Sequence, residues 1–317
     1  MPKTAPSLPD LDVMMNLVAH FEAASAQDTG LHGAELDELL RHVPGKRAIL
    51  SGTWQGQRVV FRMYLTPENT APAREWAEMT RVWPHMQSGP ARIAQPLHYA
   101  ADHGILVVEH IAGTPLMQHM WQSKPETRAA FLRPAAQWLH AYTVGSQTTV
   151  RARSGVWLER AEKGAANQPH PRLQRREHKI LKHLQRLAPL CDQPWRNAII
   201  HGDFHPNNLI ANADRLTGID MGGSASIPIY KDMARFLMHM GRRGLIPSGQ
   251  MQFGVDAQGI AAFAEAFDLS DHERELILPF MLGCEALLRV ESASIKRGRV
   301  RRAADMSDQL IADLAQI

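Results

Sequence analysis

The sequence predicts an α+β protein made of two unlike lobes, a small strand-rich half followed by a larger helical half. Strand-like runs separated by short turns are concentrated between residues 47 and 111, whereas the chain after residue 115 reads as mostly helical. Strands followed by a run of helices are typical of this fold class. With 317 residues and 44% hydrophobic content, the chain is also long enough to bury a sizeable core.

The N-terminal part is predicted to be helical over residues 10–42. Apolar residues there recur at three- and four-residue spacing, which is the period of an amphipathic helix: Leu11, Met14, Met15, Val18 and Phe21. The segment GLHGAELDELLRHV at 30–43 offers a second short helix.

From Arg47 onward the period changes to that of strands. RAILSGTW and QRVVFRMYL flank a Gln55–Gly56 turn, and together they predict an antiparallel hairpin. The segment at 72–86 then predicts an amphipathic helix with Trp76, Met79 and Val82 on one face. ARIAQPLHYA and GILVVEHI, on either side of a DHG turn, predict two further strands.

Charge and composition indicate a cytoplasmic globular protein. The formal net charge of +3 gives no argument for a nucleic-acid partner. The segment MPKTAPSLPDLDVMM has no apolar run that would serve as a signal sequence, and no stretch approaches 18 consecutive apolar residues, so we expect no membrane partner. Cys191 and Cys284 are expected to be reduced. Basic runs at 172–186 and 296–302 are interpreted as solvated helix faces, with binding of an anion or nucleic acid as the alternative.

The segment HGDFHPNNLI at 201–210 carries the chemistry. It follows WRNAII, a short strand-like run, and LIANADRLTGID after it predicts a hairpin that would return Asp220 to the side of Asn208. Phosphoryl transfer needs a carboxylate that receives the proton of an attacking hydroxyl, here Asp203. It also needs oxygen ligands that hold Mg²⁺ against the phosphates, here Asn208 and Asp220.

A metal-hydrolase site is the alternative interpretation of this segment. His201, Asp203 and His205 could in principle share a metal ion, because residues two apart on a strand point the same way. That interpretation leaves Asn208 and Asp220 without a role, and no further histidine cluster completes the site. We therefore favour phosphoryl transfer and expect His205 to cap or pack the loop.

HGDFHPNN with GID downstream resembles the aminoglycoside phosphotransferase/choline kinase-like family, the small-molecule relatives of protein kinases. Further family landmarks follow in the expected order from about Gly45 onward: VVFRMY, REWAEM, ILVVEHIAGTPL, AAQWLHAYT and YKDMARFL. The resemblance implies a two-lobed, protein-kinase-like fold. Residues 1–110 would form an N-terminal helical extension and a small nucleotide-binding lobe with an antiparallel sheet. Residues 111–317 would form the helical lobe with the catalytic loop, facing a cleft between the lobes.

The resemblance assigns roles within and around the loop. Asp203 would be the catalytic base, and Asn208 and Asp220 would hold Mg²⁺, with Asp220 in IDMGG replacing the Asp-Phe-Gly of protein kinases. Three residues would support the loop: His201, Gly202 and Asp232.

Nucleotide-binding residues are implied in the first lobe. Arg62 stands where lysine is better known and would contact the phosphates of ATP or GTP, with Glu75 as its partner and Glu78 as the alternative. VPGKR would cover the nucleotide through Gly45, and main-chain groups near Glu109 and Ile111 would hold adenine.

The implied reaction transfers the γ-phosphate to a hydroxyl of a small molecule, such as a sugar, an amino sugar or an amino alcohol. The helical half lacks an acidic cluster for a polycationic antibiotic and an aromatic cage for choline, which favours a neutral or anionic acceptor. The alternative is a non-catalytic nucleotide-binding or scaffold protein of the same fold. A protein kinase is disfavoured because YKDMARFL follows Asp220 by only ten residues and no Ala-Pro-Glu occurs after GID.

Overall fold

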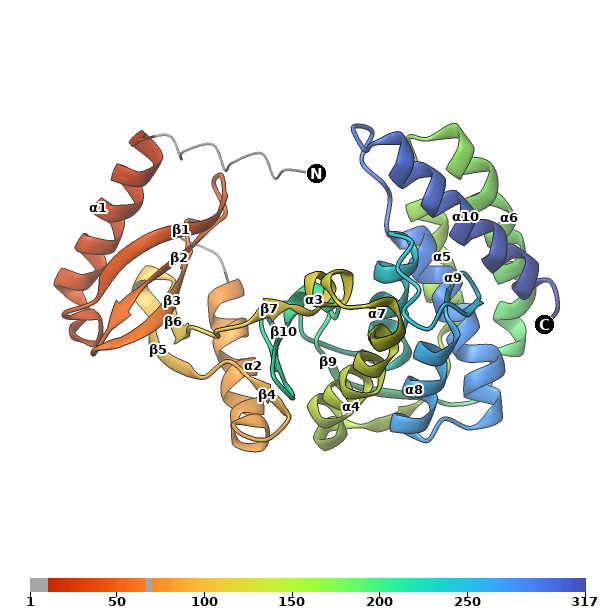
Figure 1. The fold of residues 1–317 in the computed structure, drawn as a ribbon, viewed down its shortest axis with the longest axis horizontal. Coiled ribbons are helices and arrows are strands. Elements are labelled where there is room, and N and C mark those ends of the chain that lie inside the picture. The colour runs from red at the N-terminus through yellow and green to blue at the C-terminus, as the bar shows by residue number, and fades with distance from the viewer. Residues whose placement is uncertain (1–10, 67–69) are drawn as a thin grey trace. The chain divides into compact units, whose positions relative to one another are not determined.

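The computed structural model describes residues 11–66 and 70–317. Contacts between residues divide the chain into two compact units, one of residues up to 87 together with 93–112, and one of residues 88–92 together with 113–317 (Figure 1). The predicted boundary after residue 110 therefore differs by two residues, and 88–92 lie in the second unit instead of the first. Two predictions fall partly on residues 1–10, which lie outside the described part of the chain. They are the absence of a signal sequence in MPKTAPSLPDLDVMM and the start of the first helix at residue 10.

The first unit is an antiparallel sheet with two helices, and its strand order is β1-β2-β3-β6-β5 (Figure 1). The hairpin predicted around Gln55–Gly56 is confirmed, with Trp54 opposite Gln57, and so is the helix predicted over 72–86. Its elements are α1 Leu11–Gln27, a short 3₁₀ turn Thr29–Leu31, β1 Glu35–Val43, β2 Arg47–Trp54, β3 Gln57–Tyr64, α2 Ala71–Met86, β5 Pro96–Ala100, the 3₁₀ turn Ala101–His103 and β6 Ile105–Glu109.

The second short helix predicted at 30–43 is wrong, because this segment forms the edge strand β1. Leu36 and Leu39 are three residues apart, a helical spacing that would put them on opposite faces of a regular strand. The pairing of β1 with β2 shifts in register on either side of Leu39, so β1 does not alternate its faces regularly there. Both leucines therefore pack against the core of the first unit. The exposed glutamates, aspartate and arginine of this segment suit an edge strand.

The core of the first unit lies between α1 and the sheet. Phe21 of α1 meets Phe61 of β3 edge to face, with ring centroids 5.0 Å apart, and Leu17 is buried beside them. The apolar face predicted for this helix is therefore only partly correct, because Phe21 is buried while Leu11 and Met15 are 72% and 61% exposed. The helix ends at Gln27, short of the predicted residue 42. Its packing against the sheet also holds β3, the strand that carries Arg62, in place.

The second unit is mainly helical, with three small antiparallel sheets. Its strands are β4 Ala91–Ile93 (of which residues 91 and 92 belong to this unit), β7 Thr114–Pro115, β8 Thr148–Val150, β9 Trp195–Ile200, β10 Leu209–Asn212, β11 Arg215–Gly218, β12 Ala225–Pro228, β13 Met251–Gln252 and β14 Val255–Asp256. Its α-helices are α3 Leu116–Gln122, α4 Leu132–Thr143, α5 Ser154–Ala165, α6 Pro171–Leu187, α7 Tyr230–Gly241, α8 Ala257–Phe267, α9 Leu278–Leu288 and α10 Arg297–Leu314. Shorter helical turns are Pro125–Phe131, Val144–Ser146, Ala188–Leu190, Pro206–Asn208 and the π-turn Glu273–Ile277.

Residues 88–92 join the second unit because they extend one of its sheets. The strand order of that sheet is β4-β11-β10-β7, and Leu216 donates a hydrogen bond to the carbonyl oxygen of Pro90 at 2.8 Å. The chain therefore enters the second unit briefly before it returns to form β5 and β6.

Helix α9 forms the centre of the second unit. Every residue from Leu278 to Leu287 is buried, and a helix that is apolar on all sides is expected to be surrounded by other elements. Helices α5, α6 and α7 contact it. Cys191 and Cys284 are both buried and free. Among helices of the described residues, none has the length and apolar character needed to cross a membrane.

Candidate phosphotransfer site

The motif at 201–208 forms the loop between β9 and β10 of the second unit. His201 is fully buried among the rings of Trp138, Tyr142 and Phe204, and its Nε2 lies 3.0 Å from the carbonyl oxygen of Ile219. Phe204 is also fully buried and stacks on Trp138 at a centroid distance of 5.5 Å. These two aromatic anchors hold the loop on both sides of Asp203.

Gly202 permits a backbone path that no other residue could follow. Its φ is +85°, in the left-handed region, and a Cβ at this position would lie 2.0 Å from the carbonyl oxygen of Gly223. The segment after Asp220 therefore passes directly against the loop.

Helix α7 supports the loop from the other side. The fully buried Asp232 accepts a hydrogen bond from the backbone N–H of Gly202 at 3.0 Å, and Lys231 donates from its Nζ to the Gly202 carbonyl oxygen. Both backbone groups of Gly202 are thus satisfied by side chains from the first turn of α7. These contacts are the kind expected for a bracing aspartate.

Asp203 is surrounded by positive charge. Its Oδ1 lies 2.9 Å from Nη2 of Arg235 and 3.5 Å from Nη2 of Arg289, and its Oδ2 lies 3.5 Å from Nε2 of His205. Burial opposes ionisation, but the contact with His205 and the charges of Arg235 and Arg289 outweigh it and hold the pKa of Asp203 well below its usual range. The carboxylate is therefore ionised, and 45% of its side chain remains exposed.

The predicted hairpin after the loop is confirmed. Leu209 of β10 pairs with Gly218 of β11, and the next hydrogen bond runs from the N–H of Ile219 to the carbonyl oxygen of Asn208 at 3.0 Å. Asp220 thus follows directly on the residue that faces Asn208. Its φ of +66° is unusual for a residue with a side chain, although aspartate tolerates it better than most.

Asn208 is oriented by a hydrogen bond within the loop. Its Nδ2 donates to the carbonyl oxygen of Asp203 at 3.0 Å. Because a carbonyl oxygen can only accept, this contact identifies the amide nitrogen and leaves Oδ1 as the atom with ligand character. An amide oxygen and a carboxylate are a donor set that suits Mg²⁺, so Asn208 and Asp220 fit a site of this kind.

The structure speaks against the metal-hydrolase alternative. His201 is buried with its Nε2 against a backbone carbonyl, while the His205 ring stacks on His239 at 4.3 Å. In the part of the chain that is described, no group of three or more His, Cys, Asp or Glu side chains is arranged to hold a metal ion. The His205 ring packs on His239 and also lies 3.5 Å from Asp203.

In the first unit, Arg62 pairs with Glu75. Nη1 of Arg62 lies 3.0 Å from Oε1 of Glu75, and both side chains are buried. Tyr64 donates a hydrogen bond to the second oxygen of Glu75, and burial beside this carboxylate raises the pKa of Tyr64 to about 12. Glu78, the alternative partner, holds Arg81 at 2.6 Å.

The other predicted nucleotide residues lie at the edges of the first unit. Gly45 occupies the turn between β1 and β2 with φ of +66°, and a Cβ there would meet nothing within 4 Å. Glu109 ends β6, and its N–H donates to the carbonyl oxygen of Gln95 at 3.0 Å. Ile111 follows in the connector to the second unit.

Sequence reasoning missed four side chains at these sites, namely Arg235, Arg289, Lys231 and Tyr64. A signal for Arg235 was present, because it follows Asp232 by three residues on a predicted helix and so shares its face. Lys231 is adjacent to Asp232, and Tyr64 follows Arg62 by two residues in a strand. Arg235 and Tyr64 could therefore have been found as residues on the same face as Asp232 and Arg62, whereas no such signal pointed to Lys231 or Arg289.

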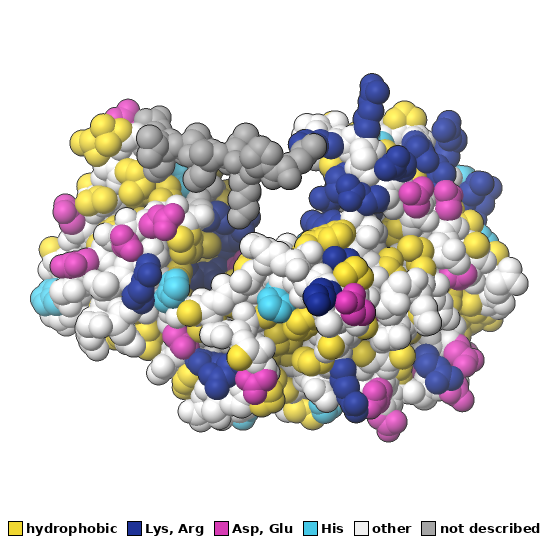
Figure 2. Space-filling model, in the orientation of Figure 1, with side chains coloured by type: hydrophobic (Ala, Val, Ile, Leu, Met, Phe, Trp, Pro, Cys, Tyr) yellow, Lys and Arg dark blue, Asp and Glu magenta, His cyan; other side chains and the backbone are white. Residues whose placement is uncertain are grey.

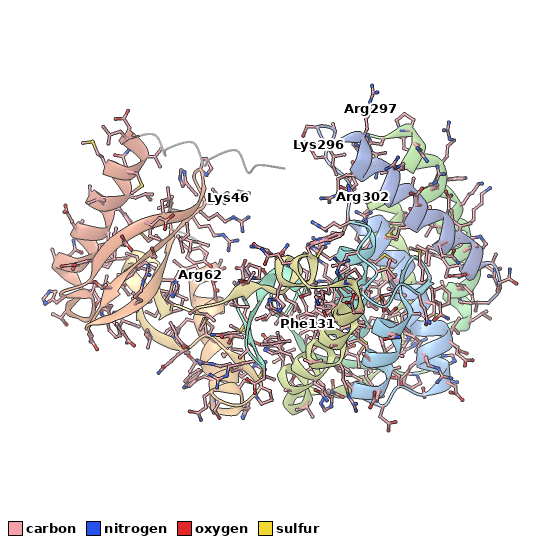
Figure 3. The ribbon with its side chains drawn as sticks, in the orientation of Figure 1. Lys46, Arg62, Phe131, Lys296, Arg297 and Arg302 are labelled. Carbon is pink, nitrogen blue, oxygen red and sulfur yellow. The ribbon has the colours of Figure 1, made fainter. Side chains whose placement is uncertain are left out.

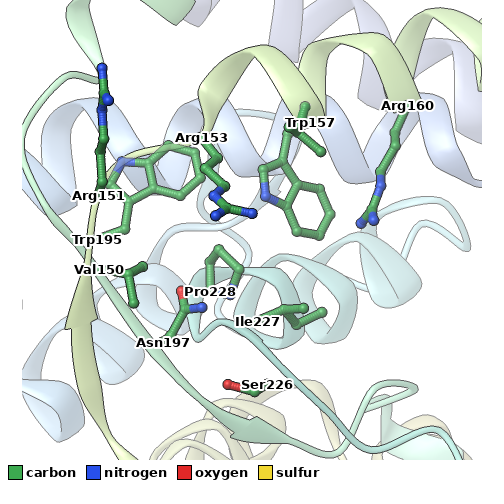
Figure 4. A pocket seen from close by; sticks show the side chains of 11 residues that line it. Val150, Arg151, Arg153, Trp157, Arg160, Trp195, Asn197, Ser226, Ile227 and Pro228 are labelled. Carbon is green, nitrogen blue, oxygen red and sulfur yellow. The ribbon is translucent and has the colours of Figure 1, made fainter.

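A separate hollow of about 300 Å³ lies on the second unit between α5, β9 and β12. Trp157, Trp195 and Asn197 line it together with Arg153 and Arg160 (Figure 4). No residue of the 201–208 loop contributes to its lining.

The sequence pattern of a family described as "Phosphotransferase enzyme family" matches residues 45–267. No curated protein is significantly similar in sequence. Among solved structures, an amicoumacin kinase in complex with AMP-PNP, Ca²⁺ and amicoumacin has a TM-score of 0.59 at 12% identity, covering 95% of this chain and 99% of that one.

Two further solved structures are similar over most of their length. A choline/ethanolamine kinase family protein from Mesorhizobium loti has a TM-score of 0.56 at 17% identity, covering 96% of this chain and 100% of that one. A glucosamine kinase in complex with glucosamine, ADP and inorganic phosphate has a TM-score of 0.51 at 15% identity, covering 98% and 83%. At these identities the likeness shows the fold, and it confirms the predicted kinase-like α+β fold.

Proposed function

Because the chain belongs to the phosphotransferase enzyme family, whose pattern matches residues 45–267, we propose that it transfers the γ-phosphate of ATP, or of GTP, to a hydroxyl of a small molecule. The chain is a small-molecule phosphotransferase; its nucleotide, its acceptor and the residues below belong to the proposal. The observation that supports them is the register of β10 and β11, which brings Asp220 next to Asn208, whose amide in turn bonds to the backbone of Asp203.

Asp203 would orient the acceptor hydroxyl and take its proton. Two guanidinium groups engage Oδ1, whereas Oδ2 has only the longer 3.5 Å contact with His205, so we assign Oδ2 as the oxygen that receives the hydroxyl proton. As the acceptor oxygen forms its bond to the γ-phosphorus, the bond from that phosphorus to the β,γ-bridging oxygen breaks, and the proton passes to Asp203 and then to solvent. A carboxylate with so low a pKa is a weak base, so its main contribution is orientation, which suits a loose transition state.

Asn208 and Asp220 would hold Mg²⁺ through Oδ1 of the amide and the carboxylate. When bound, the cation would neutralise charge on the β- and γ-phosphates. The hydrogen bond from Asn208 to the Asp203 carbonyl oxygen links this ligand to the residue that orients the hydroxyl.

Arg62 would contact the nucleotide phosphates. The buried Glu75 fixes the position of the Arg62 guanidinium and balances its charge. An arginine without such a partner would be neither oriented nor neutralised. We further propose that Gly45 covers the phosphates and that main-chain groups of Glu109 and Ile111 hold the adenine.

The acceptor class proposed is a sugar, an amino sugar or an amino alcohol. Similar folds include kinases in complex with amicoumacin and with glucosamine, which supports a hydroxylated small molecule. A cytoplasmic location and small-molecule partners, instead of nucleic acid or a membrane, belong to the same proposal.

Replacement of the catalytic carboxylate tests the function. We expect Asp203→Asn to lower nucleotide turnover by at least about a hundredfold, because the amide cannot accept the hydroxyl proton. The measurement is ADP release with a panel of hydroxylated metabolites. Asp214→Asn, which changes an exposed carboxylate in the turn of the same hairpin, is the matched control and should leave turnover unchanged.

The two variants should retain the thermal unfolding midpoint of the parent. Turnover by a well-folded Asp203→Asn protein at the parent's rate would contradict the role of Asp203. Nucleotide binding without turnover in the parent for every acceptor tried would favour the non-catalytic alternative.

A further inference from the structure

Within the described part of the chain, a group of basic side chains in the second unit forms no ion pair with a carboxylate. It consists of Arg243, just after α7, and of four residues at the start of α10: Lys296, Arg297, Arg299 and Arg302. We refer to these five residues as the basic face. Among the described residues, no Asp or Glu oxygen lies within 4.0 Å of their charged groups. Figure 2 shows Lys and Arg side chains gathered over this end of the second unit, and Figure 3 labels three of the five.

The basic face is a connected structure. Arg302 donates to the carbonyl oxygen of Arg243 at 3.4 Å, and its aliphatic stem lies over Gly244, where a Cβ would come within 2.6 Å of it. Burial and the positive charge of Arg299, with a smaller effect of Arg235, lower the pKa of Arg243 to about 10, against the opposing charge of Glu291. Arg243 is therefore close to both the start of α10 and Arg235.

Through Arg235, the basic face reaches the catalytic carboxylate. Arg235 contacts Asp203 at 2.9 Å, and Arg289 lies 3.5 Å from the same oxygen. Arg243 donates from Nη1 to the carbonyl oxygen of His239 at 2.8 Å, and the His239 ring stacks on His205, which lies 3.5 Å from Oδ2 of Asp203. An acceptor hydroxyl at Asp203 would thus lie next to the basic face.

The nearby carboxylates are already engaged. Glu285 contacts Arg289 at 2.9 Å and Arg235 at 3.7 Å. Glu291 contacts the buried Arg242 at 3.4 Å. These acids balance the arginines that they touch, and the charge of the basic face remains in excess.

A solvated surface does not account for the whole of this group. Arg243 and Arg299 are half-buried, and the Nε of Arg299 is shielded from solvent without a hydrogen-bond partner. A buried donor without a partner costs free energy, and like charges close together add to that cost. An anion with several acceptor oxygens would remove both penalties, and arginine forks bind such groups in a bidentate manner.

We infer that the phosphate acceptor carries an anionic group, a phosphate or a carboxylate, in addition to its hydroxyl, and that Arg243, Arg299 and Arg302 hold it. This inference rests on the proposed function, because it places the hydroxyl at Asp203. It replaces the solvated-face interpretation of residues 296–302 and narrows the acceptor class. A cationic amino sugar or amino alcohol without an acidic group would be repelled by the same surface.

Matched acceptors test the inference with the parent protein. Glycerol, glycerol 3-phosphate, glycerate and ethanolamine form one set, and glucose, glucose 6-phosphate, gluconate and glucosamine form another. We expect the anionic members to give kcat/KM values at least about tenfold above the neutral ones, since a hydrogen bond to a charged group contributes on that scale. The cationic members should be the poorest acceptors.

Substitutions test whether Arg243 and Arg299 bind the anionic group of the acceptor. Arg243→Gln and Arg299→Gln should each raise KM for the anionic acceptor about tenfold while KM for ATP stays within about twofold of the parent value. Arg160→Gln removes the same charge from α5, where the guanidinium lies 5.0 Å from the Trp157 ring, and should change neither constant. Thermal unfolding of all three variants checks that they are folded.

Several outcomes would overturn the inference. Neutral acceptors that equal the anionic ones, with KM values insensitive to Arg243 and Arg299, would do so while leaving the proposed function intact. A rise in KM for ATP alone would assign the basic face to the nucleotide. Tighter binding of a labelled single-stranded oligonucleotide, lost in both variants, would assign it to nucleic acid.

If no compound of either set is phosphorylated, the proposed function fails for this panel and the inference is tested by binding. Calorimetry with glycerol 3-phosphate and glucose 6-phosphate should then show binding that both arginine variants weaken. No binding, or binding that ignores the variants, would overturn it.

Discussion

Gly202 shows how one residue without a side chain determines the position of a reactive neighbour. Its N–H is held by Asp232 and its carbonyl by Lys231, while Gly223 occupies the space that a Cβ would need. The backbone therefore has a single path through this point, and Asp203 follows it by one residue. Side-chain anchors at His201 and Phe204 restrict the loop further.

We expect Gly202→Ala to destabilise the protein by at least about 1–3 kcal/mol, because the new methyl group meets a backbone oxygen and the φ of +85° is strained for alanine. Gly223→Ala is the matched control, since its Cβ would lie 3.4 Å from the nearest atom, an ordinary contact. Denaturant unfolding of both variants provides the measurement. Equal stability of the two alanine variants would contradict the close approach described for Gly202.

Asp220 carries a second residue-scale prediction. If its carboxylate holds Mg²⁺, Asp220→Ala should weaken the binding of ATP in the presence of Mg²⁺ by about tenfold or more, because a charged ligand is lost. Calorimetry with and without Mg²⁺ gives the test, and Asp214→Ala in the hairpin turn is the control. An unchanged affinity for Mg-ATP would remove Asp220 from the proposed site.

At the scale of elements, α6 is expected to make stability depend on pH. Glu177 on this helix is buried, and burial raises its pKa to about 7, with the charge of Glu291 acting in the same direction. A hydrogen bond from Gln168 and the charge of Arg242 oppose the rise. The folded protein thus holds this proton more tightly than the unfolded chain. The free energy of unfolding therefore falls as the pH rises from about 4.5 to about 7.

Glu177→Gln removes this ionisation while an amide oxygen still accepts from Gln168. We expect the variant to be more stable than the parent at pH 8, by at most about 3 kcal/mol, and to lose that advantage at pH 5. Denaturant unfolding at both values measures it, with the exposed Glu162→Gln on α5 as control. The same difference between variant and parent at both values would show that Glu177 is not protonated near neutrality.

Elements also show where the sequence was informative. Regular periods predicted α2, the β2–β3 hairpin and the β10–β11 hairpin, because in each the local spacing agrees with the side that packing buries. They predicted that α1 is a helix but not all of its buried face, since Leu11 and Met15 are exposed and Leu17 is buried. The strand β1 was missed because its bulges are a tertiary feature, and its leucine spacing imitates a helix. Pairing with β2 makes residues 35–43 a strand instead of a helix.

For the whole molecule, the order of landmarks predicted the family and the kinase-like fold, which the family match and the similar structures confirm. The loop residues could be placed from spacing alone, since a hairpin returns the chain to its starting point. The charge around Asp203 could be predicted only in part. Arg235 shares a helix face with Asp232, but its contact with Asp203, like that of Arg289 just after α9, depends on tertiary packing. Only the packing of α7 and α9 brings them to the loop.

The first two turns of α7 have a consequence for protein engineering and for the divergence of related chains. Asp232 and Arg235 lie on one face of this helix, and they hold respectively the backbone of Gly202 and the carboxylate of Asp203. The backbone shape of the 201–208 loop and the charge environment of Asp203 therefore depend on the same two turns of α7. Grafting HGDFHPNN onto another scaffold without this piece would transfer the reacting groups and leave behind what holds them in place.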